Sequence, residues 1–518
     1  NKDYIAVNQN LLFVSSESGS TKNWKIDLVS NFGQFKIANF SFDESIQEAQ
    51  RLVKIIQKLA NKEGGNLIYQ YKPSYTEEHA IKLFNILIDD IVTDNKKINE
   101  LIKLVKDSIH PNYNLVKVLG KRIAFHYGNM PLIIRQEIEK LFEQGEIKYI
   151  FCTSTLLEGV NLPAKNIFIR KPKRATKLDM TQTDFWNLAG RAGRLGKEFQ
   201  GNIICIDTNK WNTIPSLQNK KNEIIKATTI INNNFDEFLA FIDKGTPREE
   251  LSKNNNMSFE YAFNFYYTRW LDNKLSNLIK DEKKEKQLES TFSKLKENIT
   301  IPDALLKKHV GISPIAQQEL YLFLNSETKF KKFIPDDIHS DNAVESFQKI
   351  VEIVNTHLSG DFNGVSYYHA SLIVRWIRGY KLSFMIQKSL KYWGKRKKRD
   401  SVIRDVMADI ETYARFKFAK YSSCYMDILR LVLKEKGKEK LLEEIPELTI
   451  WLEFGVSQKT QLSFIELGLS RNTAILLSEY TPTSSMTRAE CKEWLKKQDL
   501  ESFEMSTILI DEINNKIN

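Results

Sequence analysis

The 518-residue sequence has few cysteines, prolines and glycines for its length. Its four cysteines are far apart, and none lies in a CxxC pattern or a cluster of Cys and His. This spacing indicates neither a disulfide framework nor a zinc site, so we expect a reduced, cytoplasmic protein without a metal site of its own. Twelve prolines and 21 glycines are too few for a fibrous or mostly disordered chain.

Long apolar runs and a negative net charge are also absent. No stretch of about 18 apolar residues and no signal-peptide pattern occurs, so we expect no membrane partner. The sequence starts with Asn1 rather than Met, from which we expect a fragment or a processed chain. The net charge is +11, which favours a polyanionic partner because each cation that neutralises a phosphate releases counterions. An ordinary basic protein is the alternative.

Short apolar strands alternate with amphipathic helices up to about residue 210. Ser74 and Glu77 form a capping-box pattern, which predicts that Ser74 is the N-cap of a helix. We expect strands at residues 66–71, 148–152, 166–169 and 202–206, with a helix at 132–142. This alternation predicts a parallel sheet with helices on both faces. The chain after residue 210 has long Lys- and Glu-rich amphipathic patterns and is predicted to be mainly α-helical.

The segment WNLAGRAGRLG contains two arginines, Arg191 and Arg194. On a helix, residues three apart point in the same direction, so both guanidinium groups would be presented on one face. Such a pair can bind a triphosphate and stabilise the charge that develops on a transferred phosphoryl group. The flanking glycines would let this helix approach another surface closely. A basic helix cap is the structural alternative.

A second pattern, FCTSTLLEGVNLPA at residues 151–164, follows an apolar strand. Thr153 and Ser154 therefore fall at the carboxyl end of a parallel strand, where ligands bind in α/β folds. Their hydroxyl groups and the N-terminus of a following helix can hold a phosphate of a nucleic-acid backbone. These residues predict a nucleic-acid contact.

Together with NLIYQYKPSYTEEHA at residues 66–80, these segments resemble motifs IV, V and VI of superfamily 2 helicases. They occur in the right order and are most similar to the Ski2-like group of these DEAD/DEAH-type enzymes. The resemblance implies an α/β RecA-like parallel sheet domain, the second of the helicase motor, followed by a mainly α-helical C-terminal region. It also implies ATP and Mg²⁺ as cofactors, bound mainly by a first RecA-like domain, and single-stranded or partly duplex DNA or RNA as partner.

The resemblance assigns a role to each matching residue. Arg191 and Arg194 match the catalytic arginines that reach the γ-phosphate, with Arg194 favoured as the finger. Asn187 stands where the family usually has Gln, which puts in doubt the hydrogen bond that this Gln makes. The positions near the nucleotide are Gly159, Asn161, Asn187 and Gly190, and those near the tracked strand are Ser74, Tyr75, Thr153 and Ser154.

The helical region carries further candidates. In the segment 411–429, aromatic and basic residues are interleaved. A helix that offers stacking faces and cations together can bind unstacked single strands, so we expect Arg415, Lys417 and Tyr421 to contact nucleic acid. The run of five basic residues at 395–399 is either a phosphate-binding loop or a solvated charge run. The pattern LGLSRxxA near Gly468 and Ser470 predicts a helix-hairpin-helix unit or a plain helical hairpin.

The resemblance therefore divides the chain into five segments. We expect a connector from a first RecA-like domain (1–42), the RecA-like domain (43–210), a helical linker with a winged helix as an alternative (211–310), a ratchet-like helical bundle (311–435) and a helical C-terminal segment (436–518).

Two motifs of an ATPase are missing. The sequence has no GxxxxGK[ST] phosphate loop and no DEAD, DEAH or DExH box. We therefore expect that the chain alone does not hydrolyse ATP and that the full-length protein does, with the first RecA-like domain in cis or in trans. The alternative is a non-enzymatic nucleic-acid-binding or scaffold subunit with a RecA-like fold.

Overall fold

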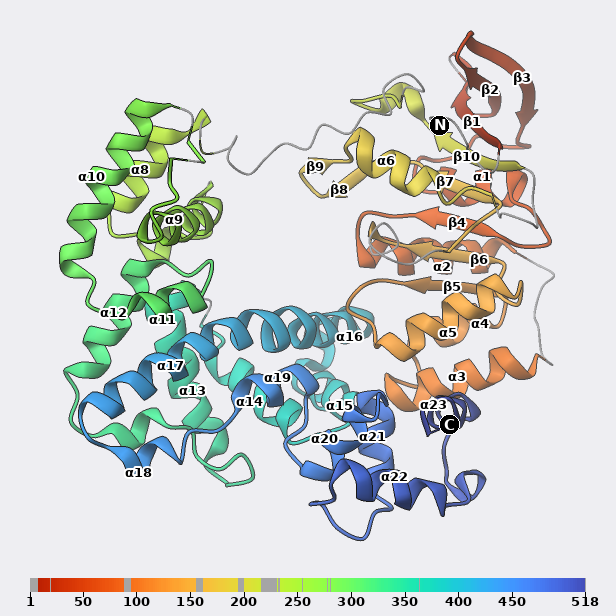
Figure 1. The fold of residues 1–518 in the computed structure, drawn as a ribbon. Coiled ribbons are helices and arrows are strands. Elements are labelled where there is room, and N and C mark those ends of the chain that lie inside the picture. The colour runs from red at the N-terminus through yellow and green to blue at the C-terminus, as the bar shows by residue number, and fades with distance from the viewer. Residues whose placement is uncertain are drawn as a thin grey trace.

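The computed structural model describes residues 8–517, apart from residues 19, 88–94, 155–161, 194–199, 216–230, 232, 254, 277, 280 and 363. An α/β domain forms one side of the molecule, and helices form the rest (Figure 1). This arrangement confirms the predicted fold class. Among the described residues, no helix is long and apolar enough to cross a membrane.

One sheet of eight strands has the order β3-β2-β1-β10-β7-β4-β6-β5. From β1 to β5 in this order all neighbouring strands are parallel, whereas β2 and β3 extend the sheet in antiparallel fashion. The strands are β1 (Asn8–Ser16), β2 (Asn23–Ser30), β3 (Gly33–Ser41), β4 (Asn66–Tyr69), β5 (Ile123–His126), β6 (Tyr149–Cys152), β7 (Asn166–Ile169) and β10 (Gln200–Ile206). A separate hairpin consists of β8 (Lys173–Ala175) and β9 (Leu178–Asp179).

The sheet begins before residue 43, where we had placed the boundary of the α/β domain. β1 pairs in parallel with β10, from Asn8 opposite Gln200 to Val14 opposite Ile206. Leu11, Val14 and Trp24 are buried in the same core as the other strands. Residues 8–41 are thus part of the domain, because β10 offers an edge that the apolar β1 covers. Their role as a connector stays a prediction.

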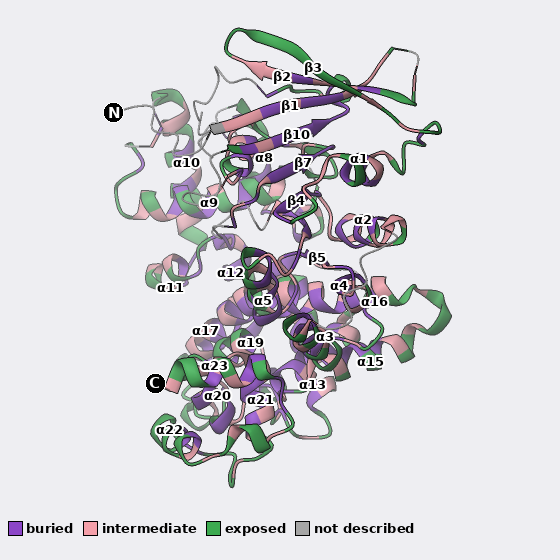
Figure 2. Cartoon of the chain, turned by 90° about the vertical axis from the view of Figure 1, so that its right-hand side faces the viewer, coloured by how far each residue is buried: buried purple, intermediate pink, exposed green. Residues whose placement is uncertain are grey.

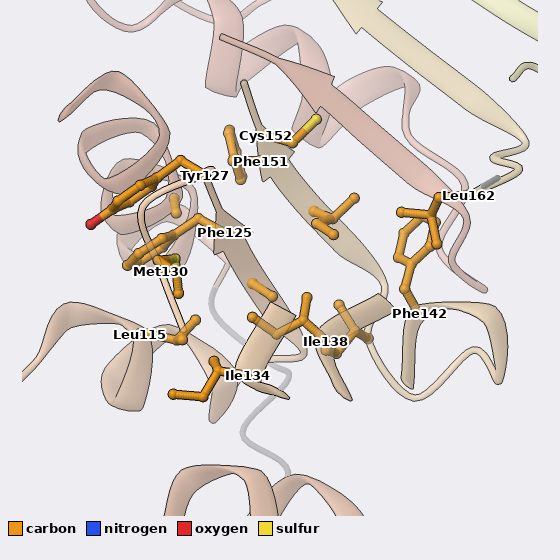
Figure 3. Packing of buried hydrophobic residues seen from close by; sticks show 14 of the residues in the cluster. Leu115, Phe125, Tyr127, Met130, Ile134, Ile138, Phe142, Phe151, Cys152 and Leu162 are labelled. Carbon is orange, nitrogen blue, oxygen red and sulfur yellow. The ribbon is translucent and has the colours of Figure 1, made fainter. Parts of the chain in front are cut away.

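Among the described residues, six helices accompany the sheet, and every residue of β4, β5, β6 and β7 is buried. Figure 3 shows Leu115 of α4 and Ile134 and Ile138 of α5 in the same buried cluster as Phe125 of β5 and Phe151 of β6. Such fully buried, mainly apolar strands are expected when a parallel sheet is covered on both faces. The helices are α1 (Arg51–Leu59), α2 (Pro73–Ile86), α3 (Lys96–Ser108), α4 (Asn114–Leu119), α5 (Leu132–Glu143) and α6 (Gln182–Ala189).

The predicted capping box at the start of α2 is wrong. Lys72 is the N-cap, Pro73 is the first helical residue, and no side chain caps the helix. The fixed φ of proline suits the first helical position, so the helix begins one residue before Ser74. Glu77 is not used in a cap, because its carboxylate accepts a hydrogen bond from the Tyr127 hydroxyl at 2.9 Å.

The region after β10 is helical wherever it is described and has regular structure. Its elements are η2 (Thr208–Lys210), α8 (Phe235–Asp243), η3 (Arg248–Glu250), α9 (Asn256–Leu271), α10 (Glu282–Asn298), α11 (Asp303–Lys308), α12 (Pro314–Asn325), η4 (Phe330–Phe333), α13 (Ala343–Val354), η5 (Asn355–Ser359), α14 (Ser366–Ile377), α15 (Leu382–Trp393), η6 (Gly394–Arg396), α16 (Arg399–Ala408), η7 (Asp409–Phe418), α17 (Ala419–Glu435), α18 (Glu439–Leu442), α19 (Leu448–Phe454), α20 (Lys459–Glu466), α21 (Arg471–Ser478), α22 (Arg488–Lys496), η8 (Leu500–Ser502) and α23 (Thr507–Ile517).

Buried apolar residues form two cores that do not follow the predicted segments. The first core joins the sheet to α15, α16 and α20–α23, and the second joins α8–α14 to η7 and α17–α19. The predicted boundary at residue 310 lies inside the second core. A winged helix includes a β-hairpin, but the described residues between 231 and 310 form helices and no strand. These described residues form a helical unit, and the winged-helix alternative for residues 211–310 stays a prediction.

A continuous helix links the two cores. It runs through α16, η7 and α17, and η7 is a π-helical stretch of ten residues (Figure 1). Such π-helical interruptions often occur at functional sites. The C-terminal helices return to α3 of the α/β domain. The Thr507 hydroxyl of α23 donates to Glu100 at 2.9 Å, and the Asn472 amide of α21 donates to the Ser108 hydroxyl at 2.8 Å.

Candidate nucleotide and nucleic-acid interface

The sheet brings the motif IV and motif V segments to the same edge. β4 and β6 are parallel neighbours, and the backbone N–H of Gln70 donates to the carbonyl of Cys152 at 2.8 Å. Tyr71 and the start of α2 follow β4, whereas Thr153 and Ser154 follow β6. The predicted strand contacts therefore start from adjacent strand ends. Thr153 is only 7% exposed, and Ser154 is half-buried.

Aromatic and basic side chains cluster in the motif IV segment. The rings of Tyr71 and Tyr75 meet edge to face at 5.2 Å, and Lys72 Nζ lies 5.5 Å from the Tyr75 ring centre. Burial and a hydrogen bond with Tyr75 raise the pKa of Tyr71 to about 12, so the Tyr71 phenol stays neutral. The Ser74 and Tyr75 side chains are half-buried. This cluster can donate hydrogen bonds to phosphate oxygens and also offers a ring face.

The predicted helical presentation of Arg191 is wrong. α6 ends at Ala189, and Arg191 lies in the following turn. The chain leaves the helix because its backbone bonds to a neighbouring segment: the Arg191 carbonyl accepts from the Ala164 N–H at 2.9 Å, and the Gly193 N–H donates to the Ala164 carbonyl at 2.8 Å. Gly193 has a φ of +99°, which favours glycine.

Two residues that the sequence analysis missed hold this turn. A Cβ atom on Gly201 of β10 would lie 2.3 Å from the Ala192 carbonyl carbon, so the turn can pass over the strand only where glycine stands. The Gln9 amide of β1 donates to the carbonyls of Ala189 at 3.0 Å and of Ala192 at 3.2 Å. A glycine inside a strand pattern is a signal for close backbone approach and could have identified Gly201. No sequence signal marks Gln9.

The Arg191 side chain lies at the carboxyl end of β6, within electrostatic reach of Cys152 and Glu139. Burial lowers the pKa of the Arg191 guanidinium, and Cys152 and Glu139 oppose this effect. Its Nε is buried and has no hydrogen-bond partner among the described residues. A buried donor without a partner is costly, and an anionic phosphate would satisfy it.

Glu139 of α5 connects Arg191 with other charged and titratable groups. Burial raises the pKa of Glu139, whereas Arg135 and Arg191 lower it. His126 Nε2 lies 3.4 Å from Glu139 Oε1, and burial lowers the pKa of His126 to about 3, so this histidine is neutral. These groups lie around the ends of β5 and β6. In the described part of the chain, no group of three His, Cys, Asp or Glu side chains could hold a metal ion.

The remaining nucleotide-side predictions are only partly placed. Asn187 is exposed on α6, and Gly190 is the exposed C-cap residue of that helix. Both thus lie within four residues of Arg191. Arg194, Gly159 and Asn161 lie outside the described residues.

The predicted contacts on the long helix are engaged with protein groups. The Arg415 guanidinium donates to Glu411 at 2.6 Å and to the Glu453 carbonyl at 3.0 Å. Lys417 Nζ donates to Asp361 at 2.9 Å. Both side chains retain partial exposure, so their nucleic-acid role stays a prediction.

Tyr421 is 7% exposed and belongs to the second core, so its position does not support the predicted stacking on a base. Helical periodicity explains this placement, since residues at four-residue intervals along α17 face the other helices. Phe416, which is 69% exposed, is the aromatic residue of this stretch that faces solvent. Lys420 Nζ lies 4.5 Å from the ring centre of Tyr261 on α9 and extends the exposed aromatic and basic surface to that helix.

The predicted helical hairpin near Gly468 is present as α20 and α21. Gly468 has a φ of +92° in the turn, and Ser470 is the N-cap of α21. The Glu512 carboxylate of α23 accepts hydrogen bonds from the Ser470 N–H at 2.7 Å and the Ser470 hydroxyl at 3.0 Å. The Ser470 N–H and hydroxyl in this hairpin are thus bonded to a carboxylate of the protein.

Comparison with known proteins identifies the α/β domain. Residues 85–196 match the family model described as the helicase conserved C-terminal domain. The matched segment contains β5, β6, β7 and α6, with Thr153 and Arg191 at the positions described above. This region is a superfamily 2 helicase C-terminal domain, of the Ski2-like group.

Curated relatives share this helicase domain. The chain is 31% identical over 109 residues to anti-bacteriophage protein B of Escherichia coli. The aligned segment covers 21% of this chain and 15% of that protein. It is 34% identical over 110 residues to Hachiman protein HamB of Bacillus cereus, and this alignment covers 21% of this chain and 10% of HamB. It is 37% identical over 95 residues to antiviral helicase SKI2 of Saccharomyces cerevisiae, and this alignment covers 18% of this chain and 7% of SKI2. The similarity to these relatives thus spans at most 15% of their own length.

Proposed function

We propose that this chain supplies the second RecA-like domain and the strand-handling extension of an ATP-dependent nucleic-acid helicase or translocase. The observation that carries the proposal is the clamped turn of motif VI. Gly201, Gln9 and Ala164 hold its backbone, and Arg191 Nε has no partner among the described residues. A guanidinium held in this way is pre-organised for a phosphate.

ATP hydrolysis also needs a phosphate loop and carboxylates that bind magnesium. The sequence contains neither motif, so these groups would come from a first RecA-like domain, in cis or in trans. Arg191 and Arg194 would then reach the γ-phosphate across the interface and stabilise the charge that develops during transfer. Asn187, Gly190 and the motif V residues Gly159 and Asn161 would line the same interface.

The nucleic-acid strand would lie along the carboxyl edge of the sheet. Ser74 and Tyr75 would contact its phosphates from the β4 side, and Thr153 and Ser154 from the β6 side. Closure of the two motor domains would then move the strand along this edge. The long helix, with the exposed ring of Phe416, would limit backward slipping by stacking on a base.

The first test combines this chain with a matching ATP-loading domain and measures magnesium-dependent ATP hydrolysis with and without single-stranded DNA or RNA. Arg191→Gln should lower turnover by at least about 100-fold and leave nucleic-acid binding nearly unchanged, because the arginine acts on phosphoryl transfer. Arg430→Gln is the matched control, since Arg430 lies on α17, is partly exposed and among the described residues pairs with Asp427 at 3.3 Å and with the exposed Glu447 at 3.4 Å.

Two results would contradict the proposal. Magnesium-dependent hydrolysis by this chain alone would show that the missing motifs are not needed. No strand-stimulated hydrolysis in the combined protein would favour the alternative, a non-enzymatic binding or scaffold subunit. An equal loss of turnover and of binding in Arg191→Gln would contradict only the role assigned to Arg191.

A further inference from the structure

The segment from Tyr380 to Arg399, which contains α15 and η6, has an unusual composition. It contains eight Lys and Arg residues and no Asp or Glu. It also contains four aromatic residues, Tyr380, Phe384, Tyr392 and Trp393. Binding sites for single-stranded nucleic acid typically combine basic side chains, which pair with phosphates, with aromatic side chains, on which bases stack.

The fold arranges five of these side chains at four-residue intervals. Phe384, Lys388 and Tyr392 are four residues apart on α15 and therefore lie on one face of the helix. Tyr380 precedes the helix and Arg396 follows Gly394, and their contacts with the Phe384 and Tyr392 rings extend this face into a stripe. The members of this α15 stripe are Tyr380, Phe384, Lys388, Tyr392 and Arg396. Each step along the helix advances by about 6 Å, which is comparable with one nucleotide of an extended strand.

Aromatic and cationic members of the stripe alternate in contact. The rings of Tyr380 and Phe384 meet at 5.1 Å, and Lys388 Nζ lies 5.1 Å from the Phe384 ring centre. Arg396 Cζ lies 5.2 Å from the Tyr392 ring centre and also contacts Trp393 at 5.6 Å. These cation–π contacts hold the rings in place while their other faces stay available.

The stripe faces solvent and is not needed for the core. Tyr392 is 64% exposed, and Tyr380 and Phe384 are 37% and 38% exposed. The opposite face of α15 contributes Met385 and Ile386 to the first core. In Figure 2, α15 and the exposed turn that follows it lie at the rim of the molecule, on the same side as α1 and α2.

Most of the cations in this segment have no counter-charge. Lys381 pairs with Glu479, Lys397 with Asp405, and Arg399 approaches Asp400 at 3.8 Å. The exposed Lys388, Lys391, Lys395, Arg396 and Lys398 form no ion pair with any described residue. Uncompensated charges of one sign repel one another, and a polyanion would relieve this repulsion.

We infer that the α15 stripe is a second binding site for single-stranded nucleic acid, outside the helicase motifs. Unstacked bases would lie on Phe384 and Tyr392, and the backbone phosphates would pair with Lys388, Lys391 and Lys395. Single strands fit better than duplexes, because only unstacked bases expose their faces to aromatic rings. The inference rests on the proposed nucleic-acid function and extends the strand path from the motor edge to α15.

The experiment uses the full chain and measures binding of fluorescent oligothymidylate and oligouridylate by anisotropy over a range of salt concentrations. Phe384→Ala/Tyr392→Ala should weaken binding by about 10-fold or more, since each base–aromatic stack contributes a factor of that order. Lys388→Gln/Lys391→Gln/Lys395→Gln should reduce the salt dependence, the slope of log K against log salt, by about 2.

The matched control is Phe32→Ala/Phe35→Ala, which removes two exposed aromatic residues from the β2–β3 hairpin. This control should bind as the unchanged chain does. The circular dichroism spectrum of the α15 variants should be unchanged, because the stripe lies outside the core.

Three outcomes would overturn the inference. Wild-type affinity in both α15 variants, while Ser74→Ala/Tyr75→Ala weakens binding, would refute the second site but leave the proposed function standing. A loss of duplex binding that matches the loss of single-strand binding would refute stacking as the mode of recognition. No binding of any nucleic acid by the unchanged chain would overturn both proposals.

Discussion

Arg404→Ala should weaken the junction between the α/β domain and the long helix in a pH-dependent way. Arg404 of α16 forms an ion pair with Glu77 of α2. The same carboxylate accepts hydrogen bonds from the hydroxyls of Tyr127 at 2.9 Å and Tyr113 at 3.3 Å. Glu77 and both tyrosines are almost completely buried, so the carboxylate that joins the two structural units is shielded from water.

The size of the effect follows from the pKa of Glu77. Burial raises this pKa from 4.5 to about 7, although Arg404 and the Tyr127 hydrogen bond lower it. The difference corresponds to about 3 kcal/mol of folding free energy. Because the folded state holds the proton more tightly, this contribution is fully present below pH 4.5 and is lost as the pH rises through about 7.

Removal of Arg404 deprives the carboxylate of its counter-charge, so the pKa of Glu77 should rise further. Near pH 8 the variant should lose about 2 kcal/mol of stability relative to the unchanged chain, because pH 8 lies only about one unit above the pKa of Glu77 and linkage limits the pH-dependent part of the loss to about 1.4 kcal/mol. Near pH 5, where Glu77 is protonated in both proteins, the loss should fall to about 1 kcal/mol.

Urea denaturation followed by circular dichroism at both pH values measures these losses. Adding Glu77→Gln to Arg404→Ala should remove most of the pH dependence, because no carboxylate is then buried. Arg430→Ala, which breaks a partly exposed pair, should cost less than about 1 kcal/mol at either pH. An equal loss at both pH values, or no change on adding Glu77→Gln, would refute the reasoning.

Two further predictions concern the turn that carries Arg191. Gly201→Ala places a Cβ atom 2.3 Å from backbone atoms and should cost about 1–3 kcal/mol in urea denaturation, whereas Gly120→Ala, whose nearest such atom is 3.4 Å away, should cost less. If the two variants are equally stable, the close approach is not limiting. Gln9→Ala removes two hydrogen bonds to backbone carbonyls and should cost about 1–2 kcal/mol, with slower strand-stimulated ATP hydrolysis in the combined protein. Unchanged stability and turnover would show that β1 does not support the turn.

Local patterns in the sequence determined the elements of the α/β domain. The apolar segments 66–71, 148–152, 166–169 and 202–206 are buried strands, with small shifts at their ends. Each is bounded by polar or glycine residues, so its strand character depends little on distant contacts. The order of the helicase motifs along these strands also placed Thr153 at a strand end, because a parallel sheet collects the carboxyl ends of its strands at one edge.

Contacts between distant segments were decided only by the tertiary structure. Gln9 is far from Arg191 and Gly201 in the sequence, and only the pairing of β1 with β10 brings it to the turn. Tyr421 and Phe416 have similar local surroundings in the sequence, yet the first is buried and the second is exposed. Neighbouring residues in a helical sequence point to different faces of the helix. Which of these faces is buried depends on the elements that pack against it, and the local sequence does not specify them.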